Sequence, residues 1–124
     1  MAKKKNKQKI DGPCPIASVI EVFGGKWKSS ILYHLEQRGT LRFSELHRLI
    51  PEVSKRMLTL QLRELERDGL VQREYFPEIP PRVEYSARAV ASSLAPVFQV
   101  IDDWGKKNLK AIYKSRRGYD SSAN

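Results

Sequence analysis

The spacing of apolar residues changes at Gly69, and this change limits the chain to folds that combine helices with a small sheet. Before Gly69, apolar residues recur every three or four positions, which is typical of helices that bury one face. After it, residues 71–76 and 82–85 alternate between apolar and polar side chains, which predicts a β-hairpin. From about residue 87 the helical spacing returns. We therefore expect an α+β chain that is mainly helical.

Four helices are predicted before the hairpin, each with a start or stop signal. Their expected ranges are 15–23, 27–38, 43–50 and 55–68. Ser54 is the expected N-cap of the fourth helix and Gly69 its terminator. Residues 40–41 are expected to form a very short strand. Beyond the hairpin, Pro96 should start a new helix or kink an existing one, because proline cannot donate a backbone hydrogen bond.

Composition excludes several kinds of site. The chain has 124 residues, enough for one domain with its own core, and a single cysteine, Cys14. With only His34 and His47 besides, we expect no intrachain disulfide, no metal site and no cofactor. No apolar run is long enough to span a membrane, and the N-terminus lacks the apolar stretch of a signal peptide. The expected location is the cytoplasm, in association with the nucleoid.

Positive charge is concentrated at the two ends of the chain. Residues 1–9 contain five lysines and no acid, and residues 106–124 contain six basic residues against one acid. Residues 10–105 are almost neutral, with 12 Lys or Arg and 13 Asp or Glu. We expect a basic tail over 1–13, one domain over 14–110 and a second basic tail over 111–124, with both tails disordered. Such tails suit nonspecific attraction to phosphates, although they also occur as solubilising extensions.

A helix, a short turn, a Ser-capped helix and a hairpin occur in the order of a winged helix-turn-helix, in which the capped helix enters the major groove of DNA. On a helical wheel, Leu58, Leu62 and Leu65 form the core-facing stripe. The opposite face holds Arg56, Arg63 and Arg67, with Thr59 and Leu60 at its edges. Arginine can grip guanine O6 and N7 together. The alternative is a solvated arginine face that forms ion pairs with Glu64 and Glu66.

The candidate DNA-binding residues fall into three groups. Arg56, Arg63 and Thr59 are expected to contact bases, and Ser54 and Lys55 to contact phosphate at the helix N-terminus. Arg67 is a weaker candidate because it lies near the other end of the helix. Arg82, after two prolines in the wing, is placed to contact a minor groove or a phosphate, and Arg42 and Ser44 to contact the backbone across the groove.

Several separate motifs occur in one order with matching gaps, and together they resemble the HxlR-type winged-helix transcriptional regulators of the MarR-like superfamily. The motifs are Cys14-Pro15, Gly24-Gly25-Lys26-Trp27, Arg42-Phe43-Ser44-Glu45-Leu46, Leu62-Arg63-Glu64-Leu65, Asp68-Gly69-Leu70-Val71 and Pro80-Pro81-Arg82-Val83-Glu84-Tyr85-Ser86. The likeness covers about residues 14–108. It implies a homodimeric bacterial regulator, expected here to be a repressor, that pairs through its first and C-terminal helices and binds a pseudo-palindromic double-stranded DNA operator. The chain departs from the family pattern at Ala87-Arg88-Ala89-Val90 and at Leu60.

Cys14 lies at the start of the first predicted helix, where the helix dipole stabilises a thiolate. Lys7 and Lys9 would add to this effect if the N-terminal tail lies nearby. In the resembled family a cysteine at this position often senses oxidants or electrophiles, which implies a redox-sensing role for Cys14. The alternative is an inert residue at the dimer contact. Because the chain has no second cysteine, oxidation would join Cys14 to its twin in the partner subunit, join it to a small thiol, or stop at the sulfenic acid.

Two other functions compete with DNA binding. A winged-helix RNA-binding or ribosome-associated module would suit the lysine-rich tails, but aromatic residues that stack on RNA bases usually lie on an open sheet, whereas Tyr75, Phe76 and Tyr85 lie on a hairpin that resembles a wing. An enzyme would need Cys14 beside a base, and nothing places His34 or His47 there. We therefore expect a regulator that is not an enzyme.

Overall fold

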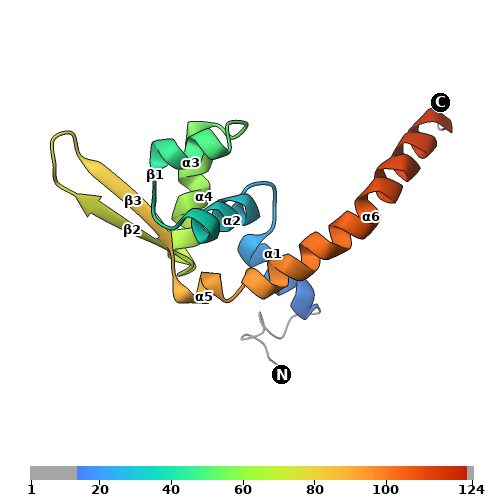
Figure 1. Cartoon of the computed structure of the whole chain (residues 1–124), viewed down its shortest axis with the longest axis horizontal. Helices are drawn as coiled ribbons and strands as arrows, with labels where there is room; N and C mark the ends of the chain where they lie inside the picture. Colours follow the sequence, from blue (N-terminus) through green and yellow to red (C-terminus); the bar gives the residue numbers. More distant parts are fainter. Residues whose placement is uncertain (1–13, 123–124) are drawn as a thin grey trace, which may run out of the picture. The chain divides into compact units, whose positions relative to one another are not determined.

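The computed structural model describes residues 14–122; the N-terminal tail expected over 1–13, with Lys7 and Lys9, lies outside them. The elements follow the predicted order (Figure 1). They are α1 (Pro15–Phe23), α2 (Lys28–Arg38), β1 (Leu41–Arg42), α3 (Phe43–Leu49), α4 (Lys55–Arg67), β2 (Val71–Phe76), β3 (Arg82–Ala87), α5 (Ala89–Ser92) and α6 (Ala95–Ser122). The expected α+β, mainly helical winged helix-turn-helix is confirmed.

The described chain divides into two compact units, one ending at Ser92 and the other beginning at Ser93. The first, called here the N-terminal unit, contains α1 to α5 and the sheet. The second consists of α6. Pro96 is the second residue of α6. Of the two outcomes predicted for this proline, a new helix or a kink, the structure shows a new helix.

The core of the N-terminal unit comes from the helical stripes that the sequence predicts. Its largest fully buried side chains are Ile31, Leu32, Leu35, Leu46, Val53, Leu58, Leu62, Leu65 and Val71. Those from α4 lie three or four positions apart, which places them on one helix face. Full burial of a Leu or Ile side chain contributes about 1.5 to 3 kcal/mol relative to exposure. This core fixes the orientation of α4 and leaves its other face in solvent.

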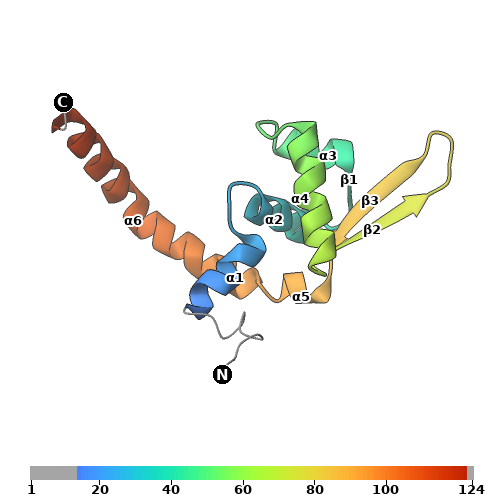
Figure 2. The ribbon, with the colours of Figure 1, turned by 180° about the vertical axis from the view of Figure 1, so that it is seen from behind.

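The sheet is antiparallel, in the strand order β1-β3-β2. Its register pairs Leu41 with Tyr85 and Val71 with Ala87. Gly69 links α4 to β2 at a φ of +81°, a conformation that residues with a Cβ rarely adopt. Figures 1 and 2 show the far ends of β2 and β3 projecting away from α2, α3 and α4 as a wing.

The prediction of a disordered C-terminal tail is wrong over 111–122. These residues continue α6 to Ser122, and the expected boundary after residue 110 falls inside this helix. The physical reason is that Lys and Arg are good helix formers and no proline interrupts the stretch. The charge of the stretch suggested a tail, whereas Leu109 and Ile112 extend the helical apolar pattern.

Candidate nucleic-acid interface

The turn between α3 and α4 is fixed by one cap and one side-chain hydrogen bond. Ser54 Oγ accepts a hydrogen bond from the Met57 amide at 3.0 Å, which confirms the predicted N-cap. His47 Nε2 donates to the Val53 carbonyl at 2.8 Å, and Val53 is buried. His47 is therefore a half-buried residue, and its ring holds the turn by bonding to the turn backbone. Together these contacts set where α4 begins.

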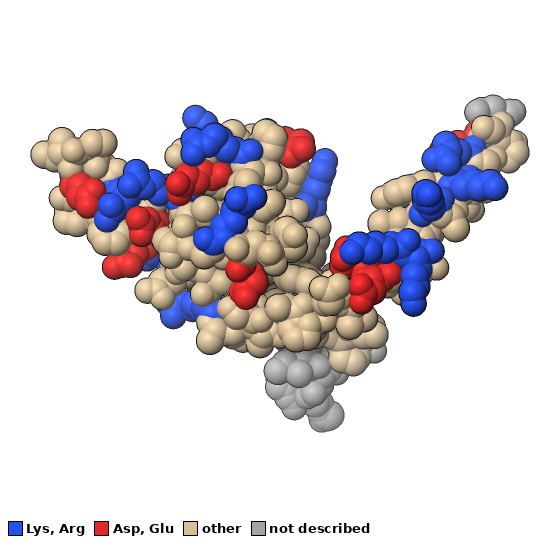
Figure 3. Space-filling view, viewed as in Figure 1, with Lys and Arg blue, Asp and Glu red and all other residues tan. Residues whose placement is uncertain are grey.

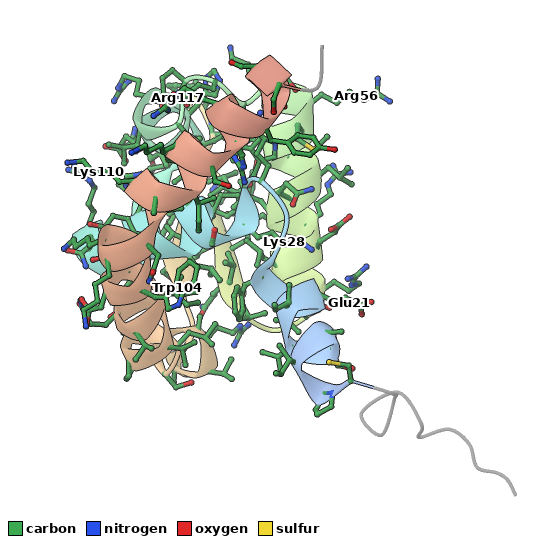
Figure 4. The ribbon with its side chains drawn as sticks, turned by 90° about the vertical axis from the view of Figure 1, so that its right-hand side faces the viewer. Glu21, Lys28, Arg56, Trp104, Lys110 and Arg117 are labelled. Carbon is green, nitrogen blue, oxygen red and sulfur yellow. The ribbon has the colours of Figure 1, made fainter. Side chains whose placement is uncertain are left out.

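The outward face of α4 is the arginine face predicted from the helical wheel. Arg56, Arg63 and Arg67 are all exposed, on the side opposite the buried leucines. In Figure 4, Arg56 extends away from the first turn of α4. A depression in the surface runs along this face, lined by Ser54, Arg56, Met57, Thr59, Leu60 and Arg63. The depression contains all of the residues nominated above except Lys55, Arg82, Arg42 and Ser44 and the weaker candidate Arg67.

The carboxylates nearest to this face are paired with other cations. Glu64 lies 2.7 Å from Lys28 Nζ of α2, and Glu66 lies 3.2 Å from Arg73 Nε of β2. Within residues 14–122, neither Arg56 nor Arg63 forms an ion pair. Glu64 and Glu66 therefore do not form the ion pairs with the arginine face that the alternative requires. Both guanidinium groups remain available to an external anion.

Arg67 differs from the other two arginines. Its Nε donates to Asp68 Oδ1 at 3.0 Å, and this pairing raises the pKa of the guanidinium. Asp68 is the C-cap of α4. Arg67 is thus engaged at the end of the helix away from the Ser54 cap, which agrees with its weaker candidacy.

Lys28 is the one buried charged residue among those that the structure describes, and its partner is Glu64. The hydrogen bond from Lys28, and the charge of its ammonium, lower the pKa of Glu64. The pair joins the first residue of α2 to the tenth residue of α4. It therefore links α4 to α2.

Thr59 is less free than its place on the wheel suggests. Its Oγ1 donates to the Lys55 carbonyl at 2.9 Å, so the hydroxyl hydrogen is already used. Its methyl group and oxygen lone pairs are still available to a base edge. Leu60 and Met57, by contrast, are apolar side chains exposed on the same helix.

A second depression lies between α4 and the wing. It is lined by Thr59, Leu62, Arg63, Glu66, Arg73, Val83 and Tyr85. Arg73 was not nominated from the sequence, because only the fold brings β2 beside α4. Burial raises the pKa of the Tyr85 hydroxyl, which lines this depression. Since Tyr85 is buried and only Tyr75 of the three hairpin aromatics is exposed, no open stacking platform for RNA forms on the described hairpin.

Arg82, nominated in the wing, is held by two carboxylates and a ring. Its Nη2 lies 3.1 Å from Glu78, and its Nε lies 3.2 Å from Glu84 without a hydrogen-bonding angle. The guanidinium also lies over the Phe76 ring, 4.1 Å from the centroid. A phosphate would have to compete with Glu78 and Glu84 for this arginine.

Arg42 and Ser44, the other flanking candidates, are exposed at the start of α3. The Arg42 amide donates a hydrogen bond to Glu45 Oε1 at 2.8 Å.

Cys14 is exposed and is the N-cap residue of α1, but its side chain accepts no capping hydrogen bond. Pro15 follows it as the first helical residue, as predicted. Ile16, Val19 and Ile20 of the same helix are also exposed, whereas Phe23 is buried.

His34, the other histidine, is half-buried, and burial followed by the charge of Arg38 lowers its pKa. Among residues 14–122 no three His, Cys, Asp or Glu side chains gather as metal ligands. No helix of this described part is both long enough and apolar enough to cross a bilayer.

Comparison with known proteins gives a consistent result. Residues 22–113 match the family described as HxlR-like helix-turn-helix. The chain is 48% identical over 103 residues to YdeP, an HTH-type transcriptional regulator of Bacillus subtilis (strain 168), a match covering 83% of this chain and 76% of YdeP. It is 44% identical over 116 residues to the regulator YybR of the same organism, covering 94% of this chain and 92% of YybR. Among solved structures, the redox regulator HypR in its reduced form aligns with a TM-score of 0.75 and 42% identity, over 82% of this chain and 99% of HypR.

Proposed function

Because this chain belongs to the HxlR-like family of helix-turn-helix transcriptional regulators, which bind DNA and are not enzymes, we propose that it acts as a homodimeric repressor of a pseudo-palindromic operator. The observation that carries this proposal is the pair of unpaired arginines on the outward face of α4, Arg56 and Arg63. A helix that presents two free guanidinium groups beside a wing suits the major groove of duplex DNA. As a DNA-bound regulator, the protein would act in the cytoplasm, on the nucleoid.

Each nominated residue has a distinct role in this proposal. Arg56 and Arg63 recognise guanine, and Thr59 contacts a base edge with its oxygen or methyl group. Ser54 and Lys55 bind phosphate at the positive end of α4. Arg42 and Ser44 contact the backbone across the groove, and Arg82 contacts the minor groove or a phosphate after release from Glu78 or Glu84.

We further propose that Cys14 is the redox-sensing residue. Its thiol is exposed at the N-terminus of α1, where oxidants and electrophiles can reach it. The similarity to HypR, a protein described as a redox regulator with reduced and oxidised forms, supports this role. Two Cys14 thiols from partner subunits would lose two protons and two electrons to an oxidant such as diamide and form one disulfide. An electrophile would instead form a bond to the sulfur with loss of its proton.

The DNA-binding proposal is tested by selection from a random duplex library, followed by mobility-shift titration of the selected sequence. We expect a sequence with two-fold symmetry and a shift that weakens as salt rises. Single-stranded RNA should compete no better than unrelated duplex. Enrichment of no sequence would contradict sequence-specific DNA binding, and preferential binding of RNA would support the RNA-binding or ribosome-associated alternative.

The Cys14 proposal is tested on the same operator, before and after treatment with diamide, a quinone or an aldehyde. Wild-type affinity should change with at least one reagent and recover with a reducing thiol after diamide. Cys14→Ser should bind the operator like the untreated wild type and should not respond. An equal response in the serine variant would make Cys14 structural.

A further inference from the structure

The unit formed by α6 carries a row of cations that the roles above leave unused. Lys107, Lys110, Lys114 and Arg117 follow one another at spacings of three, four and three residues. At about 100° per residue, these four side chains fall within an arc of roughly 80° on one side of the helix. We call these four residues the basic stripe. Figure 3 shows blue side chains along α6, and Figure 4 labels Lys110 and Arg117 on the same side of it.

The basic stripe has no ionic partner in the part of the chain that the structure describes. Lys106, beside it, pairs with Asp102 at 3.0 Å, and Arg116 lies over the ring of Tyr113. Residues 104–119 contain six cations and no acid. Like charges three or four residues apart destabilise a helix. Favourable interaction of cations with the helix dipole is limited to the last turn, so it does not explain Lys107 or Lys110.

We propose that the basic stripe is a second DNA-binding surface, which contacts the phosphate backbone without reading sequence. The four cations extend over about 15 Å, since the rise is 1.5 Å per residue. One strand of B-DNA presents about four phosphates over the same axial length. The stripe and a DNA strand have opposite charges at similar spacing, which favours duplex DNA as the partner. This inference rests on the DNA binding proposed above and adds a surface separate from α4.

The basic stripe extends beyond the part of the chain that matches the family model. The family match ends at residue 113, so Lys114 and Arg117 lie beyond it. The opposite side of α6 also argues against a membrane surface as the partner. Opposite the basic stripe lie Ile112 and Tyr119, but also Asn108 and Arg116, whereas a helix that lies in a bilayer interface needs a continuous apolar face.

The test compares the full-length wild type with a variant in which all four stripe residues are replaced by glutamine. Dissociation constants are measured on the selected operator and on unrelated duplex of equal length, from about 50 to about 200 mM salt. The variant should bind both duplexes at least tenfold more weakly, by the same factor. Its plot of log affinity against log salt should be shallower by about 0.9 for each phosphate that the stripe no longer neutralises, up to about 3.6 per chain. The ratio of operator to unrelated affinity should not change.

A matched pair of single variants controls for charge. Lys110→Gln should reduce both affinities and the salt slope, whereas Arg116→Gln, which removes the same charge from another side of α6, should change them less. Helix content and sedimentation of all variants should equal those of the wild type. An unchanged salt slope in the fourfold variant would overturn the proposal.

Other outcomes separate this inference from the proposed function. If the wild type binds duplex without selectivity, the recognition role of α4 fails, while the unrelated duplex still tests the basic stripe. If the wild type binds no duplex, both fail. If the wild type binds phosphatidylserine vesicles and the fourfold variant does not, while DNA binding stays intact, the stripe belongs to a membrane surface and our proposal is refuted.

Discussion

At the scale of single residues, the interface depends on which charges are already paired inside the chain. Glu64 is paired with Lys28, and Glu66 is paired with Arg73. Arg56 and Arg63 on α4 therefore have no carboxylate partner in the described chain. The arginine face itself follows from helical periodicity, so the sequence predicts it. The partners of the two glutamates do not follow from sequence, because the fold brings them from α2 and β2. The spacing of residues in the sequence predicts which side chains share one face of a helix. Ion pairs between different elements can be identified only from the tertiary structure.

We predict that Arg56→Ala and Arg63→Ala each weaken operator binding by about 1 to 3 kcal/mol, because each removes a bidentate base contact. Binding to unrelated duplex should change much less, and thermal unfolding should not change, since both side chains are exposed. Arg67→Ala is the control, because Arg67 pairs with Asp68. Titration on operator and unrelated duplex measures all three variants. Unchanged operator affinity in both Arg56→Ala and Arg63→Ala would remove α4 from the recognition role.

The wing allows a second prediction at this scale. Replacing Glu78 and Glu84 by glutamine frees Arg82, so affinity for duplex DNA should rise several-fold at low salt. Removal of two acidic charges would by itself also raise the affinity for DNA. The same double substitution is therefore also made with Arg82→Ala, where most of the gain should disappear. An equal gain in both backgrounds would show that Arg82 does not contact DNA.

At the scale of elements, sequence signals are strongest where a helix begins. The Ser54 cap, the Pro15 start of α1 and the Pro96 start of α6 are all predictable, because each depends on local backbone chemistry. The end of α6 is harder to predict, because a run of cations is compatible with both a tail and a helix. Charge composition favours the tail, whereas the helical spacing that Leu109 and Ile112 continue favours the helix. At this end of the chain, periodicity is the better guide.

The cap is a direct target for measurement. Ser54→Ala removes the acceptor for the Met57 amide and should lower the free energy of unfolding by about 1 kcal/mol. Ser54→Asp, which keeps a capping oxygen, should retain most of the stability. Chemical denaturation of the three proteins gives the comparison. An alanine variant as stable as the wild type would mean that the cap does not stabilise α4.

The Lys28–Glu64 pair predicts a pH dependence. Lys28 lowers the pKa of Glu64 in the folded chain, so the pair stabilises the fold at pH values above the ordinary Glu pKa and loses this effect as the pH falls through the lowered value. Glu64→Gln should therefore lower Tm at neutral pH and leave the buried Lys28 without a counter-charge. The difference from the wild type should shrink below about pH 4.5, the ordinary value for Glu. Glu66→Gln, which removes a more exposed ion pair, should lower Tm less. A Tm difference between Glu64→Gln and the wild type that stays constant with pH would contradict the role of the Lys28–Glu64 pair.

At the scale of the whole molecule, apolar side chains remain exposed on two helices that the family resemblance assigns to dimerisation. On α1 they are Ile16, Val19 and Ile20, and on α6 they are Val97, Ile101 and Trp104, each between 42% and 67% exposed. Phe23, at the end of α1, is instead buried within its own chain. Several exposed apolar side chains on one helix usually mark an interface. No residue of α6 is buried in the described single chain, so the helix has no core of its own to stabilise it.

We predict that the protein is a two-fold dimer at micromolar concentration, with its two recognition helices about 34 to 36 Å apart, one turn of duplex DNA or a multiple of it. Burial of a large apolar side chain contributes about 1.5 to 3 kcal/mol, so a charge at the centre of such an interface should disrupt it. Trp104→Glu on α6 (Figure 4) should therefore sediment as a monomer and lose most of its operator affinity, because a monomer binds only one half-site. Tyr119→Glu, a comparable change farther along α6 at a side chain 74% exposed, should remain a dimer. A wild type that sediments as a monomer would refute the dimer, and a dimeric Trp104→Glu would place the interface away from this part of α6.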